Sequence, residues 1–227
     1  RELGTLAQSR GLWLHVDACV GGFLSPYVKR LGHAVPDWDF SVPGVMSISA
    51  DLHKHGMAAK GASLMLLRSK ELKETHQLFD FREWERGPYA AYTMQGTRPG
   101  GAIAAAWATL QYLGDEGYLR LTESARSTTR QLAQAIQEID GLQLRATPDS
   151  TLLSFGAQGF DVFAVADELS LHGWYVDRQA PPDSLHCTVN AVHHQMIEEF
   201  IVDLRHAVAK VQDAGSTGSV GAYGTIE

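Results

Sequence analysis

The sequence lacks the features that mark secreted, nucleic-acid-binding or membrane-spanning proteins. Its only two cysteines, Cys19 and Cys187, are too few for a disulfide framework, so we expect a reducing, cytoplasmic compartment. Lysines and arginines number 19 against 26 aspartates and glutamates, and the net charge of −7 leaves no basic stripe to neutralise nucleic-acid phosphates. No apolar run approaches the roughly 20 residues that span a bilayer, and no stretch reads as a signal peptide. A membrane anchor upstream of Arg1 stays open.

The chain also lacks an initiator methionine, since it opens on Arg1. Residues 1–10 read as the end of a helix that stops at Gly11, and residues 12–17 read as a buried strand. Buried parallel strands need neighbours on both sides. We therefore expect this chain to be the C-terminal part of a longer polypeptide, whose upstream half completes the sheet and most of the site.

Hydrophobic residues make up 44% and charged residues 20% of the 227 residues, which is typical of a globular protein. Short apolar runs alternate with stretches of helical periodicity, and this alternation predicts an α/β fold. We expect the C-terminal part of a large domain with a mainly parallel sheet at 1–141. A small α/β domain would follow at 142–212, and a Gly- and Ser-rich flexible tail at 213–227.

Within the large domain we expect strands at 12–17, 45–49 and 62–67. The stretches 23–43 and 80–100 read as loops, and a long loop in a compact domain is usually functional. Two further helices are expected at 70–76 and at 102–139, the second interrupted at 114–117. The small domain reads as β-α-β-β-α, with strands at 152–155, 174–177 and 185–189 and helices at 161–172 and 191–211.

Asp17 and Lys54 lie at and just after the ends of two predicted strands, and together their side chains suit one cofactor. Asp17 ends the first strand, where open α/β sheets place ligands, and Lys54 lies in a glycine-flanked loop after the second strand. Pyridoxal 5′-phosphate (PLP) needs a lysine that holds it as a Schiff base and a carboxylate that keeps its pyridine nitrogen protonated. Alone, Asp17 reads as a turn former and Lys54 as a surface lysine. Together they predict a PLP site.

Two histidines accompany this pair. His15 lies two positions before Asp17, so both side chains leave the same face of the strand. His53 precedes Lys54 and is a candidate for contacting the cofactor phosphate. The three histidines within 186–194 match no metal-ligand spacing, so we expect no metal site there.

Several stretches resemble the fold-type-I PLP enzymes of the group II decarboxylase superfamily. The most discriminating are Cys19, directly after Asp17-Ala18, and the Arg-Pro-Gly-Gly stretch at 98–101. Related amino-acid decarboxylases usually carry Ala in place of this Cys. The chain is most similar to the carbon–carbon lyase branch of this superfamily, and the resemblance extends over nearly all of it. The matching residues are 15–23, 47–54, 60–63, 96–101 and 222–224.

The resemblance implies a role for each matching residue. Lys60 would reach the substrate phosphate, and Tyr223 would fold back from the tail, so that both would join Lys54 in catalysis. Gly96 and Thr97 would approach the cofactor phosphate in the neighbouring subunit's site, because the family forms homodimers with shared active sites. The residues that the resemblance assigns to the cofactor are Lys54, Asp17, Cys19, Gly96 and Thr97.

The reaction implied is retro-aldol cleavage of a phosphorylated sphingoid base such as sphingosine 1-phosphate, which gives phosphoethanolamine and a long-chain aldehyde. Two alternatives stay open: a PLP-dependent decarboxylase acting on an amino acid such as glutamate or tyrosine, and a non-catalytic module with the same fold. Release of carbon dioxide or of aldehyde separates the two enzymes. The yellow colour of bound PLP separates both from the module.

Each assigned residue also has a simpler interpretation. Cys19 fits as a small buried filler, and Lys60 fits as a surface lysine. Tyr223 fits as part of a disordered tail. The stretch 96–101 fits plain turn chemistry before a helix.

Overall fold

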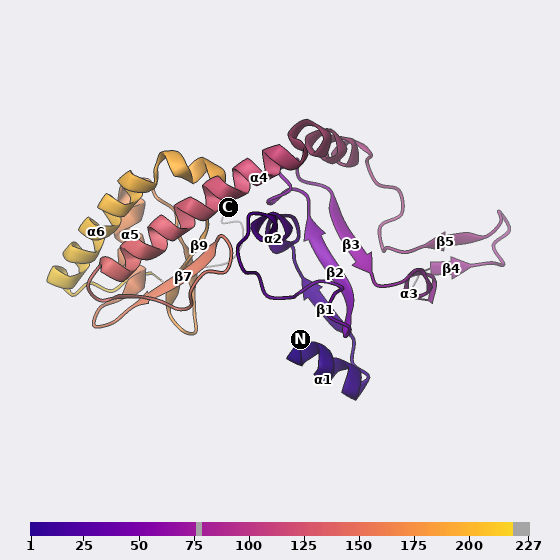
Figure 1. The fold of residues 1–227 in the computed structure, drawn as a ribbon, viewed down its shortest axis with the longest axis horizontal. Helices are drawn as coiled ribbons and strands as arrows, with labels where there is room; N and C mark the ends of the chain where they lie inside the picture. The colour runs from indigo at the N-terminus through magenta and orange to yellow at the C-terminus, as the bar shows by residue number, and fades with distance from the viewer. Residues whose placement is uncertain (76–78, 220–227) are drawn as a thin grey trace. The chain divides into compact units, whose positions relative to one another are not determined.

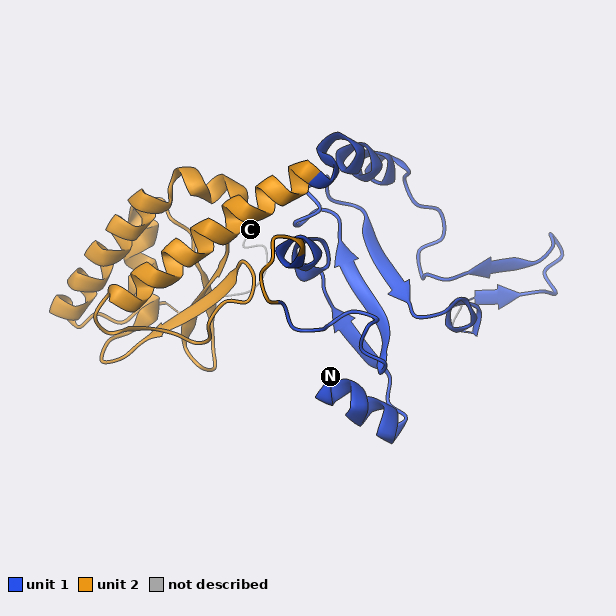
Figure 2. Ribbon diagram, viewed as in Figure 1, with its two compact units in different colours: residues 1–29, 35–115 blue, residues 30–34, 116–227 orange. Residues whose placement is uncertain are grey.

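The computed structural model describes residues 1–75 and 79–219 (Figure 1). The chain divides into two compact units (Figure 2): unit 1 comprises Arg1–Lys29 and Val35–Asp115, and unit 2 comprises Arg30–Ala34 and Glu116–Glu227. The boundary between them falls after Asp115, whereas the sequence places a domain boundary after residue 141. The division into 1–141, 142–212 and 213–227 stays a prediction about the whole protein.

Unit 1 is built around a three-stranded sheet of order β1-β2-β3. β1 (Leu14–Asp17) pairs in parallel with β2 (Val45–Asp51), and β2 pairs antiparallel with β3 (Ser63–Leu67). A parallel connection between neighbouring strands needs a crossover, usually a helix, and no helix lies between β2 and β3. The sheet in this chain is therefore mixed rather than mainly parallel, although all three strands lie where the sequence predicts them.

Helix α1 (Glu2–Arg10) ends at Gly11 as predicted, with a left-handed φ of 61°. Helix α2 (Gly21–Arg30) corrects the prediction of a loop at 23–43. Pro26 lies inside α2, and proline normally disfavours a helix interior. The helix forms because Leu24 and Val28 are fully buried, and burial of such side chains outweighs local propensity.

The small core of unit 1 joins the start of β2 to the loop before it. Its buried members are Ala18, Val42, Val45 and Ile48, with Leu14, Val16, Trp38 and Phe40 packed against them. Arg68, after β3, donates from Nη2 to the carbonyls of Phe40 (3.0 Å) and Val42 (2.6 Å). The core and this arginine fix the position of β2, on which the site depends.

Strand β3 is almost entirely exposed despite its apolar sequence. Leu64, Met65 and Leu66 are 40%, 64% and 42% exposed. Side chains alternate between the two faces of a strand, so both faces of the sheet are uncovered here among the described residues.

A short β-hairpin follows helix α3 (Lys70–Thr75) and corrects part of the loop predicted at 80–100. Strands β4 (Phe79–Phe81) and β5 (Tyr89–Ala91) pair antiparallel. Trp84 packs edge-on against Tyr89, with ring centroids 6.0 Å apart. Aromatic pairs of this geometry stabilise a hairpin that has little core of its own.

Helix α4 (Gly101–Glu138) is continuous except at Gly114, where φ is 53° and ψ is −173°. This break confirms the interruption predicted at 114–117. Only glycine adopts such a conformation without strain, so the two halves of α4 meet at the one residue type that permits it.

Unit 2 contains a four-stranded antiparallel sheet of order β6-β7-β9-β8. The predicted β-α-β-β-α succession is present, preceded by β6. The strand predicted at 174–177 is misplaced, because the ladder begins only at Asp177. The elements are β6 (Leu142–Leu144), β7 (Leu152–Ala157), α5 (Val162–Leu171), β8 (Asp177–Gln179), β9 (Ser184–Thr188), the 3₁₀ turn η1 (Ala191–Gln195) and α6 (Ile197–Ala214).

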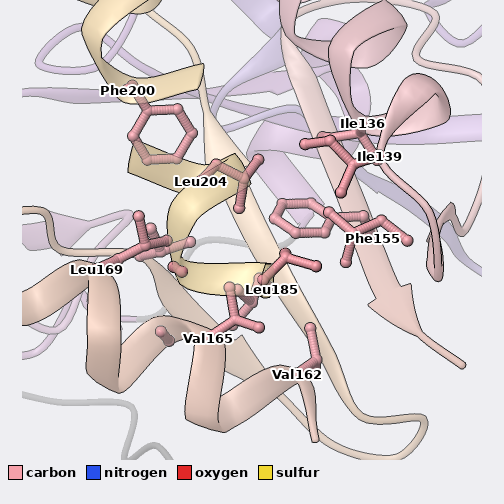
Figure 3. Close-up of a cluster of buried hydrophobic side chains, with 14 of the residues drawn as sticks. Ile136, Ile139, Phe155, Val162, Val165, Leu169, Leu185, Phe200 and Leu204 are labelled. Carbon is pink, nitrogen blue, oxygen red and sulfur yellow. The ribbon is translucent and has the colours of Figure 1, made fainter. Parts of the chain in front are cut away.

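The main core of unit 2 lies between this sheet and the helices (Figure 3). Phe155 on β7 and Leu185 on β9 are fully buried. They meet Leu169 of α5 and Leu204 of α6, while Ile136 of α4 joins from a third helix. Complete burial of side chains this large contributes roughly 2 kcal/mol each.

Candidate active site

Asp17 is the last residue of β1 and lies opposite Ser49 of β2 in the parallel pairing. Its Oδ1 accepts hydrogen bonds from the backbone N–H of Cys19 (3.1 Å) and from Ser49 Oγ (3.0 Å). The bond from the Cys19 N–H lowers the pKa of Asp17 below its usual value, and the Ser49 hydroxyl lowers it further. The strand-end carboxylate is therefore ionised at neutral pH.

Lys54 lies in a compact turn directly after β2. The N–H of Met57 donates to the carbonyl of Lys54 (3.0 Å), and that of Ala58 donates to the carbonyl of Leu52 (2.9 Å). A Cβ on Gly56 would lie 2.8 Å from the Cα of Leu52, so the turn closes only with glycine there. Met57 takes a left-handed φ of 58°, which non-glycine residues rarely adopt. The turn thus holds Lys54 at a defined place beside the strand ends.

The amine of Lys54 has two neighbours. Its Nζ lies 3.1 Å from Oδ2 of Asp51, the last residue of β2, and it also interacts with the side chain of Cys19. The interaction with Cys19 and then the pairing with Asp51 raise the pKa of Lys54, although burial opposes the shift. The Ser63 hydroxyl donates to Oδ1 of Asp51 (2.6 Å) and lowers the pKa of that carboxyl. The structure therefore brings Asp17, Cys19 and Lys54 together.

The histidines near this group have different surroundings. His15 lies between two hydroxyls, with Nδ1 2.8 Å from Ser47 Oγ and Nε2 3.2 Å from Ser49 Oγ. His53 Nε2 lies 3.9 Å from Oδ2 of Asp51. His55 is 3% exposed, and this burial lowers its pKa to about 4.

Other predicted site residues lie apart from this group or outside the described residues. Lys60 is exposed in the turn before β3, and Gly96 and Thr97 are exposed in the segment between β5 and α4. Among the described residues, no hydrogen bond or ion pair joins these three to Asp17 or Lys54. Tyr223 lies outside the described residues.

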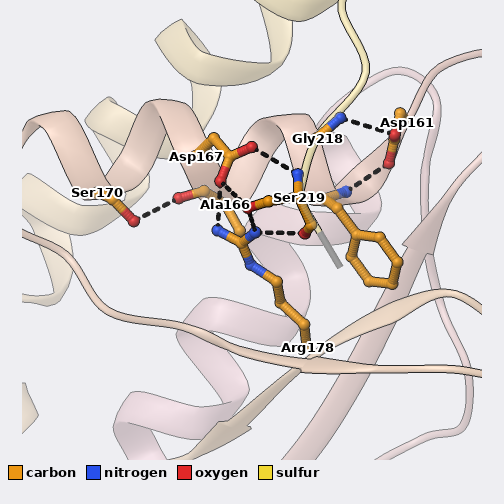
Figure 4. Close-up of polar contacts among 8 residues, drawn as sticks. Asp161, Ala166, Asp167, Ser170, Arg178, Gly218 and Ser219 are labelled. Atoms are coloured by element: carbon orange, nitrogen blue, oxygen red, sulfur yellow. Dashed lines mark hydrogen bonds and ion pairs between the residues drawn. The ribbon is translucent and has the colours of Figure 1, made fainter. Parts of the chain in front are cut away.

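The segment before Tyr223 is held on unit 2 (Figure 4). Asp161 caps α5 through Oδ1, which accepts from the N–H of Phe163 (2.8 Å), and its Oδ2 accepts from the N–H of Gly218 (2.9 Å). Asp167 Oδ2 accepts from the N–H of Ser219 (2.8 Å), and Arg178 donates to Asp167 Oδ1 (2.6 Å). Part of the tail predicted as flexible is therefore bound to α5.

Unit 2 also contains a largely apolar cavity of about 260 Å³, lined by residues that include Trp174, Cys187 and His193. Burial raises the pKa of the Cys187 thiol to about 12, so it is not a reactive thiolate. His193 Nδ1 accepts from the N–H of Asn190 (3.0 Å) and completes a helix-capping arrangement. Among residues 1–75 and 79–219 no three metal-ligating side chains gather.

The sequence prediction missed Asp51, Ser49 and Ser47 as site residues. A signal for them exists, because positions 47, 49 and 51 alternate along one strand and therefore share a face. The register with β1 then places Ser47 opposite His15 and Ser49 opposite Asp17.

An α/β domain with an ionised strand-end carboxylate and a nearby loop lysine has the two groups that fold-type-I PLP enzymes require. Residues 1–158 match the family model described as the pyridoxal-dependent decarboxylase conserved domain, and the chain belongs to this family. PLP is therefore the cofactor, and the predictions of an α/β fold-type-I domain and of PLP are confirmed.

Named relatives are similar over most of this chain. A sphingosine-1-phosphate lyase of Arabidopsis thaliana is 41% identical over 211 residues, which are 93% of this chain and 39% of the relative. An L-aspartate/L-glutamate decarboxylase of Pyrococcus horikoshii is 36% identical over 212 residues, 91% of this chain and 53% of the relative. The solved structure of Burkholderia pseudomallei sphingosine-1-phosphate lyase superposes with a TM-score of 0.88 at 35% identity, covering 93% of this chain and 48% of that one. The chain thus spans roughly half the length of these relatives or less. Among the described residues no helix is both long and apolar enough to cross a membrane.

Proposed function

We propose that this chain is part of a PLP-dependent carbon–carbon lyase that cleaves a phosphorylated sphingoid base, such as sphingosine 1-phosphate, to phosphoethanolamine and a long-chain aldehyde. The observation that carries the proposal is the grouping of Asp17, Cys19 and Lys54 at the strand ends of a domain of this family. The named lyases at 41% and 35% identity support the reaction.

The groups present suit PLP. The ionised Asp17 would pair with the pyridinium nitrogen, and Lys54 would hold the aldehyde carbon. When bound, PLP supplies an electron sink for the bond that breaks. The residues proposed to bind it are Lys54, Asp17, His15, Cys19, His53, Gly96 and Thr97.

Lys54 must lose a proton before its amine can act as a nucleophile. Asp51 Oδ2, 3.1 Å from Nζ, lies within reach of that proton. Asp51 therefore pairs with the resting ammonium.

Lys60 and Tyr223 are proposed as further catalytic residues. Lys60 is an exposed cation on a flexible stem, which suits an incoming phosphate monoester. Tyr223 lies four residues after Ser219, whose backbone N–H donates to Asp167.

Two partners are proposed for the whole protein: an upstream half of the same polypeptide and a second copy that shares the active sites. The exposed apolar side chains of Leu64, Met65 and Leu66 support a cover from outside this chain. We also propose a cytoplasmic location, which fractionation of cells expressing the tagged whole protein would test.

Product analysis tests the reaction. The purified whole protein with sphingosine 1-phosphate should release a long-chain aldehyde and phosphoethanolamine in equal amounts, and Lys54→Ala should release neither. Release of carbon dioxide from glutamate, aspartate or tyrosine, without aldehyde release, would establish the decarboxylase alternative. The similarity to the Pyrococcus horikoshii decarboxylase keeps that alternative in the test.

Reduction with borohydride tests the role of Lys54 separately from the substrate. The PLP-loaded protein should be yellow, bleach on reduction and carry the label on Lys54 in a peptide map. Label on Lys60 instead would overturn this assignment. A colourless protein that takes up no added PLP would favour a non-catalytic module.

A further inference from the structure

A row of polar side chains runs along one face of β1 and β2 toward Asp17. Trp13 Nε1 lies 2.8 Å from Ser47 Oγ, which lies 2.8 Å from His15 Nδ1. His15 Nε2 lies 3.2 Å from Ser49 Oγ, which lies 3.0 Å from Asp17 Oδ1. The five side chains thus form an unbroken series of four hydrogen bonds.

The strand register produces this row. His15 lies opposite Ser47 and Asp17 lies opposite Ser49 in the parallel pairing. Alternate residues of a strand share a face, so His15 and Asp17 project together beside the two serines. Trp13, just before β1, reaches Ser47 through its Nε1. The row therefore depends on the pairing of β1 with β2.

The direction of each hydrogen bond follows from the chemistry of the two ends. An ionised carboxylate only accepts, so the single hydroxyl proton of Ser49 goes to Asp17. His15 Nε2 must then be the donor to Ser49, and in neutral His15 the other nitrogen, Nδ1, must accept. Ser47 supplies the hydrogen for Nδ1 and accepts from the indole N–H of Trp13, which only donates.

We propose that Trp13, Ser47, His15 and Ser49 form a one-directional donor chain that fixes His15 as its Nε2–H tautomer and positions the Asp17 carboxylate for the PLP nitrogen. This inference rests on the proposed function at Asp17. Ser49 is a positioning residue, because it acts on the cofactor through Asp17. In this chain His15 acts on Asp17 through Ser49, in addition to its proposed contact with the cofactor. Donors aligned in one direction polarise one another, which strengthens the last bond to the carboxylate.

The tautomer of His15 provides a test without cofactor or catalysis. In the whole protein with ¹⁵N-labelled histidine, a His15→Gln variant identifies the His15 signals in two-dimensional NMR. At pH 8 the proton should reside on Nε2, with Nδ1 showing the shift of an unprotonated nitrogen. A proton on Nδ1 would overturn the proposal.

The affinity for PLP provides the second test. Ser49→Ala should weaken PLP binding about tenfold, since a hydrogen bond to a charged group is lost, and Ser49→Thr should restore most of it. Ser9→Ala removes a surface hydroxyl that donates to the carbonyl of Leu6, and it should leave the affinity unchanged. Equal losses in Ser49→Ala and Ser49→Thr would contradict a role for the hydroxyl.

The two proposals fail differently. If His15 carries its proton on Nδ1 while borohydride still traps PLP on Lys54, the donor chain is wrong and the cofactor site stands. If PLP is not trapped on Lys54 at all, the proposed function is wrong, whatever the tautomer of His15.

Discussion

The amine of Lys54 pairs with Asp51 and Cys19, and each of them raises its pKa. A raised pKa opposes reaction, because the amine must lose its proton to act as a nucleophile. The resting chain holds Lys54 as an ammonium ion, and the environment around the amine has to change before it reacts.

Replacing Asp51 should make Lys54 more reactive. In Asp51→Asn the pKa of Lys54 should fall, because one anionic partner is lost, and a larger share of the amine is neutral at any given pH. Competitive acetylation of the PLP-free protein followed by mass spectrometry should show Lys54 labelled faster in the variant. Asp80→Asn, which removes the partner of Arg82, is the matched control and should leave Lys54 labelling unchanged.

His55 should make stability depend on pH. Its folded-state pKa of about 4 lies below the ordinary value of 6.5, so the unfolded chain binds the proton more readily. The free energy of unfolding is therefore highest above about pH 6.5 and falls as the pH approaches 4, by about 3 kcal/mol in all. Urea unfolding at pH 7.5 and pH 5 should show this loss, and His55→Gln should reduce it. An unchanged pH dependence in His55→Gln would contradict the prediction.

The neighbouring positions of Asp17 and Lys54 were predictable, because Asp17 ends one strand, Lys54 follows the next, and the ends of a parallel pair lie at one edge of the sheet. Asp51 was not singled out, because its role depends on the turn that folds Lys54 back over three residues. No local sequence pattern fixes where Gly96 and Thr97 lie, and their assignment to the cofactor stays a prediction.

Among the secondary-structure elements, helix α5 links the interior of unit 2 to the tail. Asp161, the N-cap residue of α5, holds both segments. Its Oδ1 accepts from the N–H of Phe163 in the helix, and its Oδ2 accepts from the N–H of Gly218. A Cβ on Gly218 would overlap the backbone of Phe163 and Ala164, so the tail approaches the helix more closely than another residue allows. The tail is therefore bound by the same carboxylate that starts the helix.

Asp161→Ala should destabilise the protein by about 1 kcal/mol, the usual cost of a lost N-cap. Hydrogen exchange of the Gly218 amide should also become faster, because its acceptor is gone. Asp161→Asn keeps a capping oxygen and should lose less stability. Unchanged exchange at Gly218 in Asp161→Ala would show that the tail is held by other contacts.

The elements missed by the sequence share a cause. Helix α2 forms around Pro26 because Leu24 and Val28 are buried. The apolar run at 174–176 precedes β8 instead of forming it, because its side chains make tertiary contacts of their own. Trp174 donates from Nε1 to Asp203 (2.7 Å) and packs on Phe200 rather than joining the ladder. Such contacts between distant residues leave no local periodicity to read.

In the molecule as a whole, unit 1 has a small core and an exposed strand, β3, while unit 2 has a large continuous core. Leu66 shares its sheet face with Ile48, which is buried, yet Leu66 itself is 42% exposed. If an upstream half covers this face, a charge placed there would be buried without a partner.

Leu66→Lys should therefore lower the stability of the whole protein by about 2–4 kcal/mol, measured by thermal or urea unfolding. Leu171→Lys is the matched control, because Leu171 on α5 is 75% exposed. It should change stability by less than about 0.5 kcal/mol, as surface substitutions usually do. Equal, small effects of both changes would argue against a cover over β3.

The exposed strand also has a consequence for synthesis. Residues 61–67 carry no charge and no proline, and they are bounded by Lys60 and Arg68. A short, neutral, strand-forming segment of this kind favours amyloid-like stacking, and flanking charges act as gatekeepers against it. A nascent chain presents this segment openly. Chaperone availability during translation would then limit the yield of soluble protein.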